Sequence, residues 1–331
     1  MSNTSSYLSK VSVGYPSAHN ALLVFPLQSE PAGPGGRYQL LEEALATGGF
    51  RISEVSDSGI VSGLLATNDT SDPVFLLDGE ELIGAKQNRV LNVSIMLAPK
   101  STTEIPVSCV EAGRWRSESD NFRAPGRVHF SRGRADKLRQ VSESLRMRGR
   151  AESDQSAIWD AIAAKSARMR VDSPTAAMAA IYERRGDDLQ SYIDGFEVRA
   201  GQVGAIYVIG SKIAGLDLFD SEQTYSRLAH KLISSYAVDA MEDDTVTGAV
   251  EQNTVKAFLE KLTLASSRRY PAAGLGENVR LEASGLVGAI LEVDGLCVHI
   301  AAFPTAQFTV DQDGHEPEGS RMQRSSLRGR R

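Results

Sequence analysis

The residues best suited to chemistry gather between Pro73 and Trp115, where polar side chains crowd the ends of very apolar segments. A carboxylate can act as a general acid or base, and a thiol can act as a nucleophile. The candidate catalytic residues are Glu111, Glu81 and Cys109, with Glu80 as a further carboxylate. This stretch therefore holds the groups that acid/base or nucleophilic catalysis needs.

The same stretch offers groups that could bind a ligand. A guanidinium, an ammonium group and amides can hold an anion or a planar polar molecule, and an indole can stack on a flat ring. The candidate ligand-binding residues are Lys86, Gln87, Asn88, Arg89, Arg114 and Trp115. Gly79 and Gly84, which lack a Cβ, permit a close approach of the backbone.

Strand alternation predicts which of these residues lie together. The pattern indicates strands over residues 90–97 and 104–110, joined by a short loop that suits a hairpin. Every second side chain of a strand lies on one face, and the far ends of two antiparallel strands meet. The predicted core-facing row is Gln87, Arg89, Cys109 and Glu111.

Each of these residues also has a structural interpretation. Cysteine is among the most buried residue types, so Cys109 could belong to the core. Glu111 and Arg89 could form an ion pair at the edge of the sheet, and Trp115 could be a packing anchor. The sequence leaves both interpretations of the row open.

Other polar residues give weaker signals. Cys297 and His299 fall on one strand face, where the imidazole could be a base, a ligand or a core residue with a backbone partner. Asp217 and Asp220 could contribute to a metal site, although Asp220 and Ser221 are better explained as helix caps. The five histidines show no metal-ligand spacing, so no metal site is predicted.

Several catalytic signatures are absent from the sequence. It contains no G-x-x-x-x-G-K-[ST], no completed dinucleotide fingerprint after a strand, no G-x-S-x-G and no H-E-x-x-H. Common NTPases, elbow-type hydrolases and zinc proteases are therefore disfavoured, and the sequence assigns no cofactor.

The elements that must position these residues follow a β, then α, then β order, which predicts an α+β fold. Residues 19–304 are expected to form one domain. It comprises an antiparallel β-rich region (19–112), an Arg-rich loop with a helical segment (113–195), and a hairpin-rich sheet with two packed helices (196–304). Residues 1–18 are expected to be a flexible arm and residues 305–331 a disordered tail.

Local signals place some elements within these regions. A helix is predicted for residues 38–47, which end at two glycines, and a long helix begins at Ser221. Gly210-Ser211 and Asp294-Gly295 each separate two apolar runs, which predicts two β-hairpins.

Composition and charge restrict the class of protein. The 331 residues are 41% apolar, enough for a full core, and no run is long enough to span a bilayer, so we expect a cytoplasmic protein with free thiols and no membrane partner. The net charge of -6 conceals a basic segment, residues 114–150, with 11 Lys or Arg against 4 Asp or Glu. Such a segment could bind nucleic acid, or it could be an ordinary solvated helix face.

Two stretches of the chain resemble the bacterial ARPP domain family. They are GEELIGAKQNRVLN, from Gly79 to Asn92, and IPVSCVEAGRW, from Ile105 to Trp115. Supporting pieces are LVFPL at Leu23, LEEAL at Leu41, LFDSEQ at Leu218 and GLCVHIAAF at Gly295, so the resemblance covers about residues 21–304. The family is named for association with ADP-ribosylglycohydrolases and rhodanese-phosphatase-type proteins, which implies a phosphate-bearing ligand by association alone.

These observations lead to two functional hypotheses. The first is an enzyme, a hydrolase or a transferase, or a ligand-processing module that acts on a phosphate-bearing nucleotide derivative such as ADP-ribose. The alternative is a non-catalytic interaction or sensor module that docks nucleic acid or an acidic partner through residues 114–150. The sequence does not indicate an oligomeric state.

Overall fold

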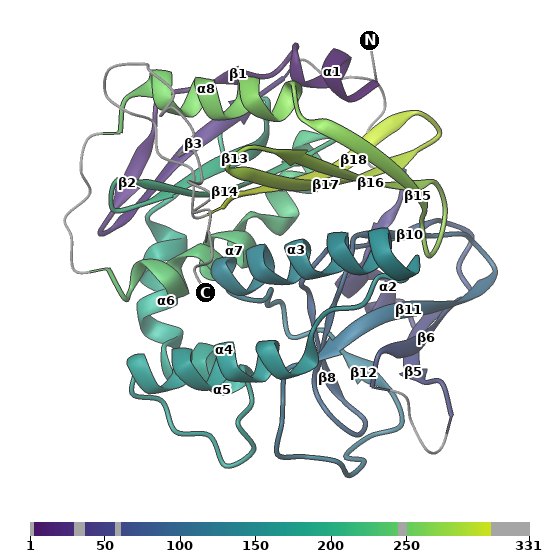
Figure 1. Cartoon of the computed structure of the whole chain (residues 1–331). Coiled ribbons are helices and arrows are strands. Elements are labelled where there is room, and N and C mark those ends of the chain that lie inside the picture. Colours follow the sequence, from purple (N-terminus) through teal and green to yellow (C-terminus); the bar gives the residue numbers. More distant parts are fainter. Residues whose placement is uncertain (1–2, 30–36, 57–60, 244–249, 306–331) are drawn as a thin grey trace, which may run out of the picture.

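The structure, a computed structural model, describes residues 3–29, 37–56, 61–243 and 250–305. It contains two main antiparallel β-structures, and helix α3 (Ser131–Arg148) runs between them (Figure 1). The predicted α+β class is confirmed, because the helices and the antiparallel strands form separate blocks along the chain. The tail expected over residues 305–331 lies outside the described residues, except for Thr305.

The larger β-structure is a nine-stranded antiparallel sheet with the order β1-β3-β13-β14-β18-β17-β16-β15, and β2 also pairs with β3. Its strands are β1 (Ser12–Val13), β2 (Ser17–His19), β3 (Leu22–Gln28), β13 (Gln202–Ile209), β14 (Lys212–Phe219), β15 (Ser266–Pro271), β16 (Glu277–Ala283), β17 (Leu286–Val293) and β18 (Leu296–Pro304). Because β3 pairs with β13, the N-terminal part of the chain completes the C-terminal sheet.

Both predicted hairpins are present in this sheet. Strands β13 and β14 pair across a turn at Gly210, and strands β17 and β18 pair across Asp294 and Gly295. The φ angles of Asp294 and Gly295 are 50° and 76°. Both lie in the left-handed region that a two-residue turn requires, which explains why an Asp-Gly pair occupies it.

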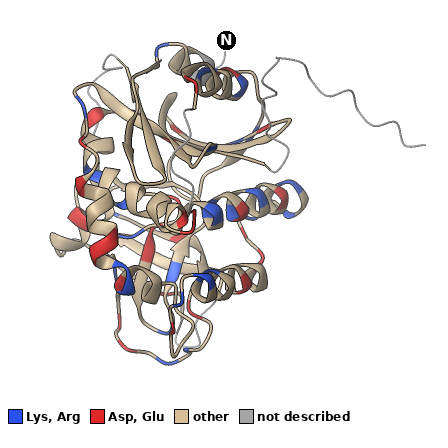
Figure 2. Cartoon of the chain, turned by 90° about the vertical axis from the view of Figure 1, so that its left-hand side faces the viewer, with Lys and Arg blue, Asp and Glu red and all other residues tan. Residues whose placement is uncertain are grey.

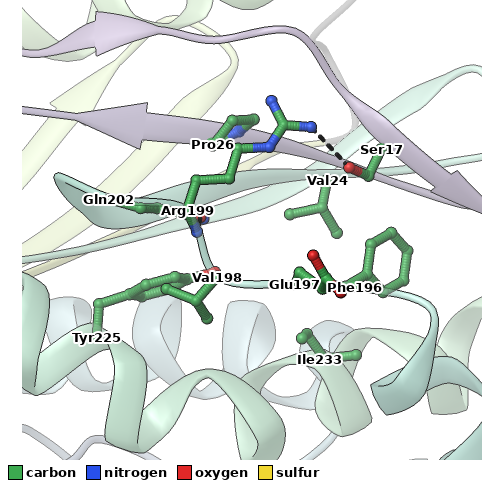
Figure 3. Close-up of a pocket in the computed structure, with 10 residues that line it drawn as sticks. All are labelled: Ser17, Val24, Pro26, Phe196, Glu197, Val198, Arg199, Gln202, Tyr225 and Ile233. Carbon is green, nitrogen blue, oxygen red and sulfur yellow. Dashed lines mark hydrogen bonds between the residues drawn. The ribbon is translucent and has the colours of Figure 1, made fainter.

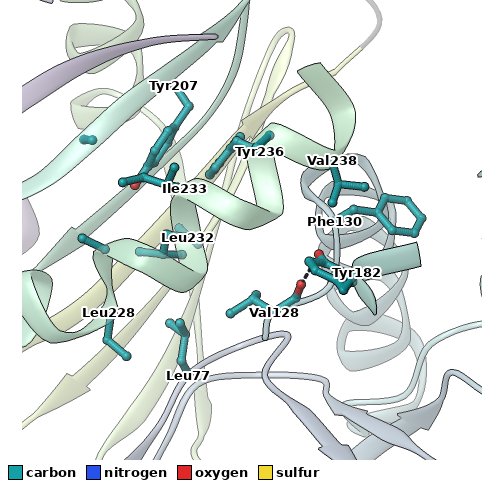
Figure 4. Packing of buried hydrophobic residues seen from close by; sticks show 14 of the residues in the cluster. Leu77, Val128, Phe130, Tyr182, Tyr207, Leu228, Leu232, Ile233, Tyr236 and Val238 are labelled. Atoms are coloured by element: carbon teal, nitrogen blue, oxygen red, sulfur yellow. Dashed lines mark hydrogen bonds between the residues drawn. The ribbon is translucent and has the colours of Figure 1, made fainter. Parts of the chain in front are cut away.

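One face of the large sheet is covered by α7 (Glu222–Ala240), which begins where Ser221 accepts a hydrogen bond from the Thr224 amide, the predicted cap. Figure 4 shows how α7 packs. Its Tyr236 ring stacks on Tyr207 of β13, with 3.8 Å between centroids and 10° between planes. Burial of large aromatic surfaces of this kind dominates the energetics of a core.

The opposite face is covered by α8 (Gln252–Thr263) and α1 (Asn3–Leu8) (Figure 1). The flexible arm expected over residues 1–18 is therefore wrong for the part that the structure describes. Leu8 is buried against the sheet, the Tyr7 hydroxyl donates to the Phe219 carbonyl, and β1 and β2 both pair with β3. A few apolar residues and edge pairing suffice to hold a segment whose composition is mostly polar.

The smaller β-structure has six strands in the order β12-β8-β9-β11-β6-β5. They are β5 (Phe50–Glu54), β6 (Gly63–Asn68), β8 (Glu81–Gly84), β9 (Arg89–Leu91), β11 (Ser101–Cys109) and β12 (Phe122–Arg123). A bridge between Ser53 of β5 and Asn121, the residue before β12, links the two edges of the sheet, which closes into a small barrel. The barrel interior is apolar and includes Ile52, Leu64, Leu82, Leu91, Val107 and Phe122.

The single strand predicted for residues 90–97 is wrong, because the chain breaks at Asn92 and changes sheets. Strand β9 stays in the barrel, whereas β10 (Ile95–Leu97) pairs with β7 (Val74–Leu76), which pairs with β4 (Gln39–Leu40). The Asn92 side chain donates to the Ala151 carbonyl at 3.0 Å and accepts from the Ser108 hydroxyl at 2.6 Å. The helix predicted for residues 38–47 is shorter in the structure. Residues Gln39 and Leu40 form β4, and the helix α2 spans Leu41–Ala46.

The central helices are α3, α4 (Gln155–Arg168), α5 (Ala179–Arg184) and α6 (Gly186–Asp194). Helix α3 buries two basic side chains. Arg134 forms two hydrogen bonds with Asp217 of the large sheet, at 2.9 and 2.6 Å. Lys137 pairs with Asp78, which precedes the barrel strand β8. Because both pairs are buried, α3 ties the two β-structures together through its charges.

Candidate functional site

The predicted row lies at one mouth of the barrel. Strand β5 ends at Glu54, β8 at Gly84 and β11 at Cys109, while β9 begins at Arg89. Strand alternation places Glu54, Arg89 and Cys109 on the face that lines the barrel interior. Cys109 lies directly opposite Arg89 in the register of β11 and β9, so the predicted meeting of these strand ends is confirmed.

Arg89 is the most unusual side chain of this mouth. It is fully buried, and its Nη1 donates to the Gln87 side-chain oxygen at 2.8 Å. Its Nε and Nη2 are buried with no hydrogen-bond acceptor among the described residues. Burial lowers the pKa of Arg89, and the nearby Cys109 and Glu54 oppose this shift. Two buried donors of a guanidinium are thus left unsatisfied, which is costly.

An indole lies over this guanidinium. The Trp115 ring centroid is 5.7 Å from the Arg89 guanidinium carbon and 5.5 Å from Lys86 Nζ, so both cations contact the ring face. Trp115 is nevertheless 50% exposed. Half of a large apolar surface therefore remains open to solvent beside two cations, at the rim of the barrel.

Cys109 is a buried thiol. Its Sγ donates to the Glu111 carbonyl at 3.2 Å, and its backbone is held by the Gln155 side chain of α4 through hydrogen bonds of 2.8 and 2.7 Å. Burial raises the pKa of the Cys109 thiol, although the Glu111 backbone and the Arg89 charge oppose the shift. A protonated thiol is a weak nucleophile, so the surroundings do not activate it.

Glu111 pairs with Arg114 and not with Arg89. Its Oε2 accepts from Arg114 Nη2 at 2.7 Å, from Arg114 Nε at 2.9 Å and from the Asn88 amide at 3.1 Å, while Oε1 accepts from the Thr175 hydroxyl at 2.7 Å. Burial raises the pKa of Glu111, but these hydrogen bonds outweigh it and the net pKa is lowered. Glu111 is therefore an ionised carboxylate with both oxygens occupied.

Arg114 and Asn88 close the turn between β8 and β9. Arg114 donates to the Ala85 carbonyl at 2.6 Å and to the Asn88 side-chain oxygen at 3.0 Å, and Gln87 donates to the Glu111 carbonyl at 3.1 Å. Three of the six candidate ligand-binding residues are thus engaged in holding the mouth together. The other three are grouped around one ring, because Lys86 and the buried Arg89 both contact Trp115.

The remaining carboxylates point elsewhere. In the register of β8 and β9, Glu81 pairs with Val90, whereas Leu82 pairs with Arg89. The Glu81 side chain therefore lies on the opposite face of the barrel wall from Arg89. There it is fully buried at 3.1 Å from Arg127, and burial raises its pKa to about 7. Glu80 pairs with Lys231 of α7 at 2.7 Å. The structure therefore does not bring Glu80 or Glu81 to the barrel mouth.

Sequence reasoning missed a buried polar network between the two β-structures. His299 lies between the Ser94 hydroxyl, 2.8 Å from its Nδ1, and Asp217, whose Oδ1 is 3.2 Å from its Nε2. The order resembles a catalytic triad, but all three residues are buried and the adjoining cavity measures about 10 Å³, room for one water. Arg134 pairs with Asp217, but the sequence around it is typical of an exposed basic helix and gave no sign of this buried pair.

Another small cavity lies under β3, between the large sheet and α7 (Figure 3). Arg199 closes it by donating to Ser17 Oγ at 2.8 Å. Its volume is also about 10 Å³, too small for an organic ligand. Among the described residues, no group of three or more His, Cys, Asp or Glu side chains is arranged to hold a metal ion.

The fold is that of an α+β protein in which a small barrel and a large antiparallel sheet share one buried helix. The chain belongs to the family of the ARG and Rhodanese-Phosphatase-superfamily-associated Protein domain, ARPP-1, whose family model matches residues 10–303. The resemblance noted in the sequence is therefore confirmed. Comparisons with curated proteins and with solved structures give no match. None of the described helices is long and apolar enough to cross a bilayer.

Proposed function

We propose that this domain binds a phosphate-bearing nucleotide derivative, such as ADP-ribose, at the barrel mouth formed by Lys86, Arg89 and Trp115. The observation that carries the proposal is the buried Arg89 guanidinium with two unsatisfied donors beneath a half-exposed indole. Phosphate oxygens would satisfy those donors, and the base would stack on Trp115. The Oε2 of Glu54, which is buried with no donor in the described part of the chain, would accept from a ligand hydroxyl.

The surroundings support binding more than catalysis at this mouth. Glu111 is ionised and fully engaged by Arg114 and Thr175, and the Cys109 thiol is protonated. Glu81, which has the pKa best suited to proton transfer near neutrality, lies on the opposite face of the barrel wall. Catalytic roles for Glu81, Cys109 and Glu111 remain predictions. A thiol reactive with iodoacetamide well below pH 8 in the folded protein would support one for Cys109.

The nucleic-acid alternative has less support. Basic and acidic residues are interleaved along the helices in Figure 2. On the exposed face of α3, Arg139 lies 3.5 Å from Asp136 and Arg146 lies 3.8 Å from Glu143. Three further basic residues of segment 114–150, Arg114, Arg134 and Lys137, are buried in ion pairs. The exposed Arg148 and Arg150 lie 3.8 and 3.7 Å from Glu152. Because these charges are largely neutralised locally, the segment does not present a single-sign face to a phosphate backbone.

The proposal is tested by calorimetric titration of the protein with ADP-ribose, NAD and a short RNA. Loss of Arg89 in R89A removes charge-assisted hydrogen bonds, so ADP-ribose affinity should fall about 10- to 100-fold. W115A changes only an exposed side chain and should also weaken binding, by about tenfold, through lost stacking.

The matched control removes three exposed arginines, Arg146 and Arg148 at the end of α3 and Arg150 just after it, and should leave nucleotide binding unchanged. Salt-sensitive RNA binding that is lost in this triple variant but kept in R89A and W115A would refute the proposal and favour the interaction module. Absence of nucleotide binding by the unmodified protein would also refute it.

A further inference from the structure

A hollow of about 630 Å³ lies where three helices meet, far larger than the two enclosed cavities. Its walls come from the end of α4, the beginning of α6, the end of α7 and the residue after β2. The lining residues used below are Arg168, Arg170, Arg185, Asp188 and Glu242. A volume of this size is typical of a small-molecule site.

The charges of this hollow favour an anion. Of the two carboxylates, Glu242 is held by Lys165 and Arg168, each at 2.9 Å, and Asp188 lies 3.3 Å from Arg185. Among the described residues, Arg170 has no ion pair or side-chain hydrogen bond. Arg185 donates through Nη1 to Asp188 and through Nη2 to the Met169 carbonyl, and its buried Nε has no acceptor within the same part of the chain. The acids are thus neutralised, and cationic donors remain for a ligand.

The backbone of Arg170 shows that this position is costly for an arginine. The Val171 amide donates to the Ser166 carbonyl at 2.9 Å, and the Arg170 amide donates to the Ala167 carbonyl at 3.2 Å. These two bonds form a Schellman motif, in which the residue at the position of Arg170 is usually glycine. Arg170 has a φ of 53°, which disfavours a side chain. The fold therefore carries an arginine where a glycine would be more stable.

A second, more open hollow of about 550 Å³ adjoins the first at Ser191. Its walls include Asp187, Gln190 and Asp194 of α6, together with His19. Carboxylate and amide oxygens accept hydrogen bonds from hydroxyl groups. The two hollows adjoin at Ser191 of α6, one cationic and the other rich in acceptors, and together they are called the α6 groove.

We propose that this groove binds a sugar phosphate, with the phosphate at Arg168, Arg170 and Arg185 and the sugar hydroxyls at Asp187 and Asp194. The site is separate from the barrel mouth and does not depend on the function proposed for it. The phosphate end supplies most of the affinity because its hydrogen bonds are charge-assisted, whereas the acceptor end selects a hydroxylated ligand over the bare anion.

The test is calorimetric titration with ribose 5-phosphate, inorganic phosphate and ribose. We expect ribose 5-phosphate to bind more tightly than inorganic phosphate, and ribose alone to give no measurable heat. The variant R170G should lose about 10- to 100-fold of the ribose 5-phosphate affinity while its melting temperature rises by about 2 °C. R170N tolerates the same backbone conformation and should show the same loss of binding.

Lys100 supplies the matched control, because it is a basic residue with a φ of 52° in a loop outside the groove. K100G should leave the affinity for ribose 5-phosphate unchanged. The variant carrying D187A and D194A, which lacks both acceptor side chains, should bind inorganic phosphate normally and lose its preference for ribose 5-phosphate. Absence of phosphate binding, equal affinity of the two phosphates for the unmodified protein, or equal affinities of R170G and K100G would overturn the proposal.

Discussion

Replacing Glu81 by glutamine should change how the stability of the protein depends on pH. Glu81 is fully buried, and burial raises its pKa from the ordinary 4.5 to about 7, with Arg127 opposing the shift. Between these two values the folded state binds more protons than the unfolded state. The free energy of unfolding therefore falls as pH rises through this window, and the contribution of neutral Glu81 is fully present only below pH 4.5.

The magnitude follows from the shift. Each pKa unit corresponds to about 1.4 kcal/mol, so a shift of about 2.5 units amounts to about 3 kcal/mol. Glutamine at this position cannot ionise, so E81Q lacks this loss. The free energy of unfolding of E81Q, minus that of the unmodified protein, should therefore increase by about 3 kcal/mol from pH 4.5 to pH 8.

The assay is urea unfolding followed by circular dichroism at several pH values across this range. Glu183 provides the control, because it contacts the same Arg127 at 3.2 Å but its side chain is 66% exposed. E183Q should show a nearly constant difference from the unmodified protein. A constant difference for E81Q as well, or one that moves against E81Q at high pH, would refute the assignment of a buried, proton-binding carboxylate.

Two further predictions concern buried charged or titratable groups. His129 is fully buried with no hydrogen-bond partner for either ring nitrogen among the described residues, and burial, together with nearby cations, lowers its pKa to about 3. Neutral His129 contributes fully to the free energy of unfolding above pH 6.5, and this contribution falls by about 1.4 kcal/mol per pH unit as pH falls toward 3. In urea unfolding, the free energy of H129F should therefore fall less steeply with acid than that of the unmodified protein. An equally steep fall for both proteins would contradict this prediction. E111Q should destabilise the protein by about 3 kcal/mol because it leaves Arg114 buried without its carboxylate; a loss below about 1 kcal/mol in the same assay would show that the pair holds little of the mouth together.

Local signals predicted the fold where neighbours in sequence decide it. The hairpin at Asp294-Gly295 depends on two residues with positive φ, and the cap at Ser221 depends on a bond to an amide three residues later. The break at Asn92 could not be predicted in this way. Apolar residues flank it on both sides, and its partners, Ser108 and Ala151, come from distant parts of the chain.

The candidate site shows the same division. The meeting of Arg89 and Cys109 followed from strand alternation and an assumed antiparallel pairing, both of which are regular. The partner of Glu111 did not follow, because Arg114 reaches it through an irregular turn that no periodicity describes. Nor did the burial of Arg134, whose partner Asp217 lies 83 residues away, since a basic helix usually faces solvent.

The two buried cations of α3 also determine how the protein can be divided. Lys137 faces the carboxylate of Asp78 beside the barrel, and Arg134 faces that of Asp217 in the large sheet. A fragment that ends before β13 would keep Arg134 but lose its carboxylate, and one that starts after α3 would leave Asp217 without its guanidinium. Because an unpaired buried charge costs several kcal/mol, neither fragment is a natural folding unit. Two β-structures that look separable should therefore melt in one cooperative transition, and truncations between them should yield insoluble protein.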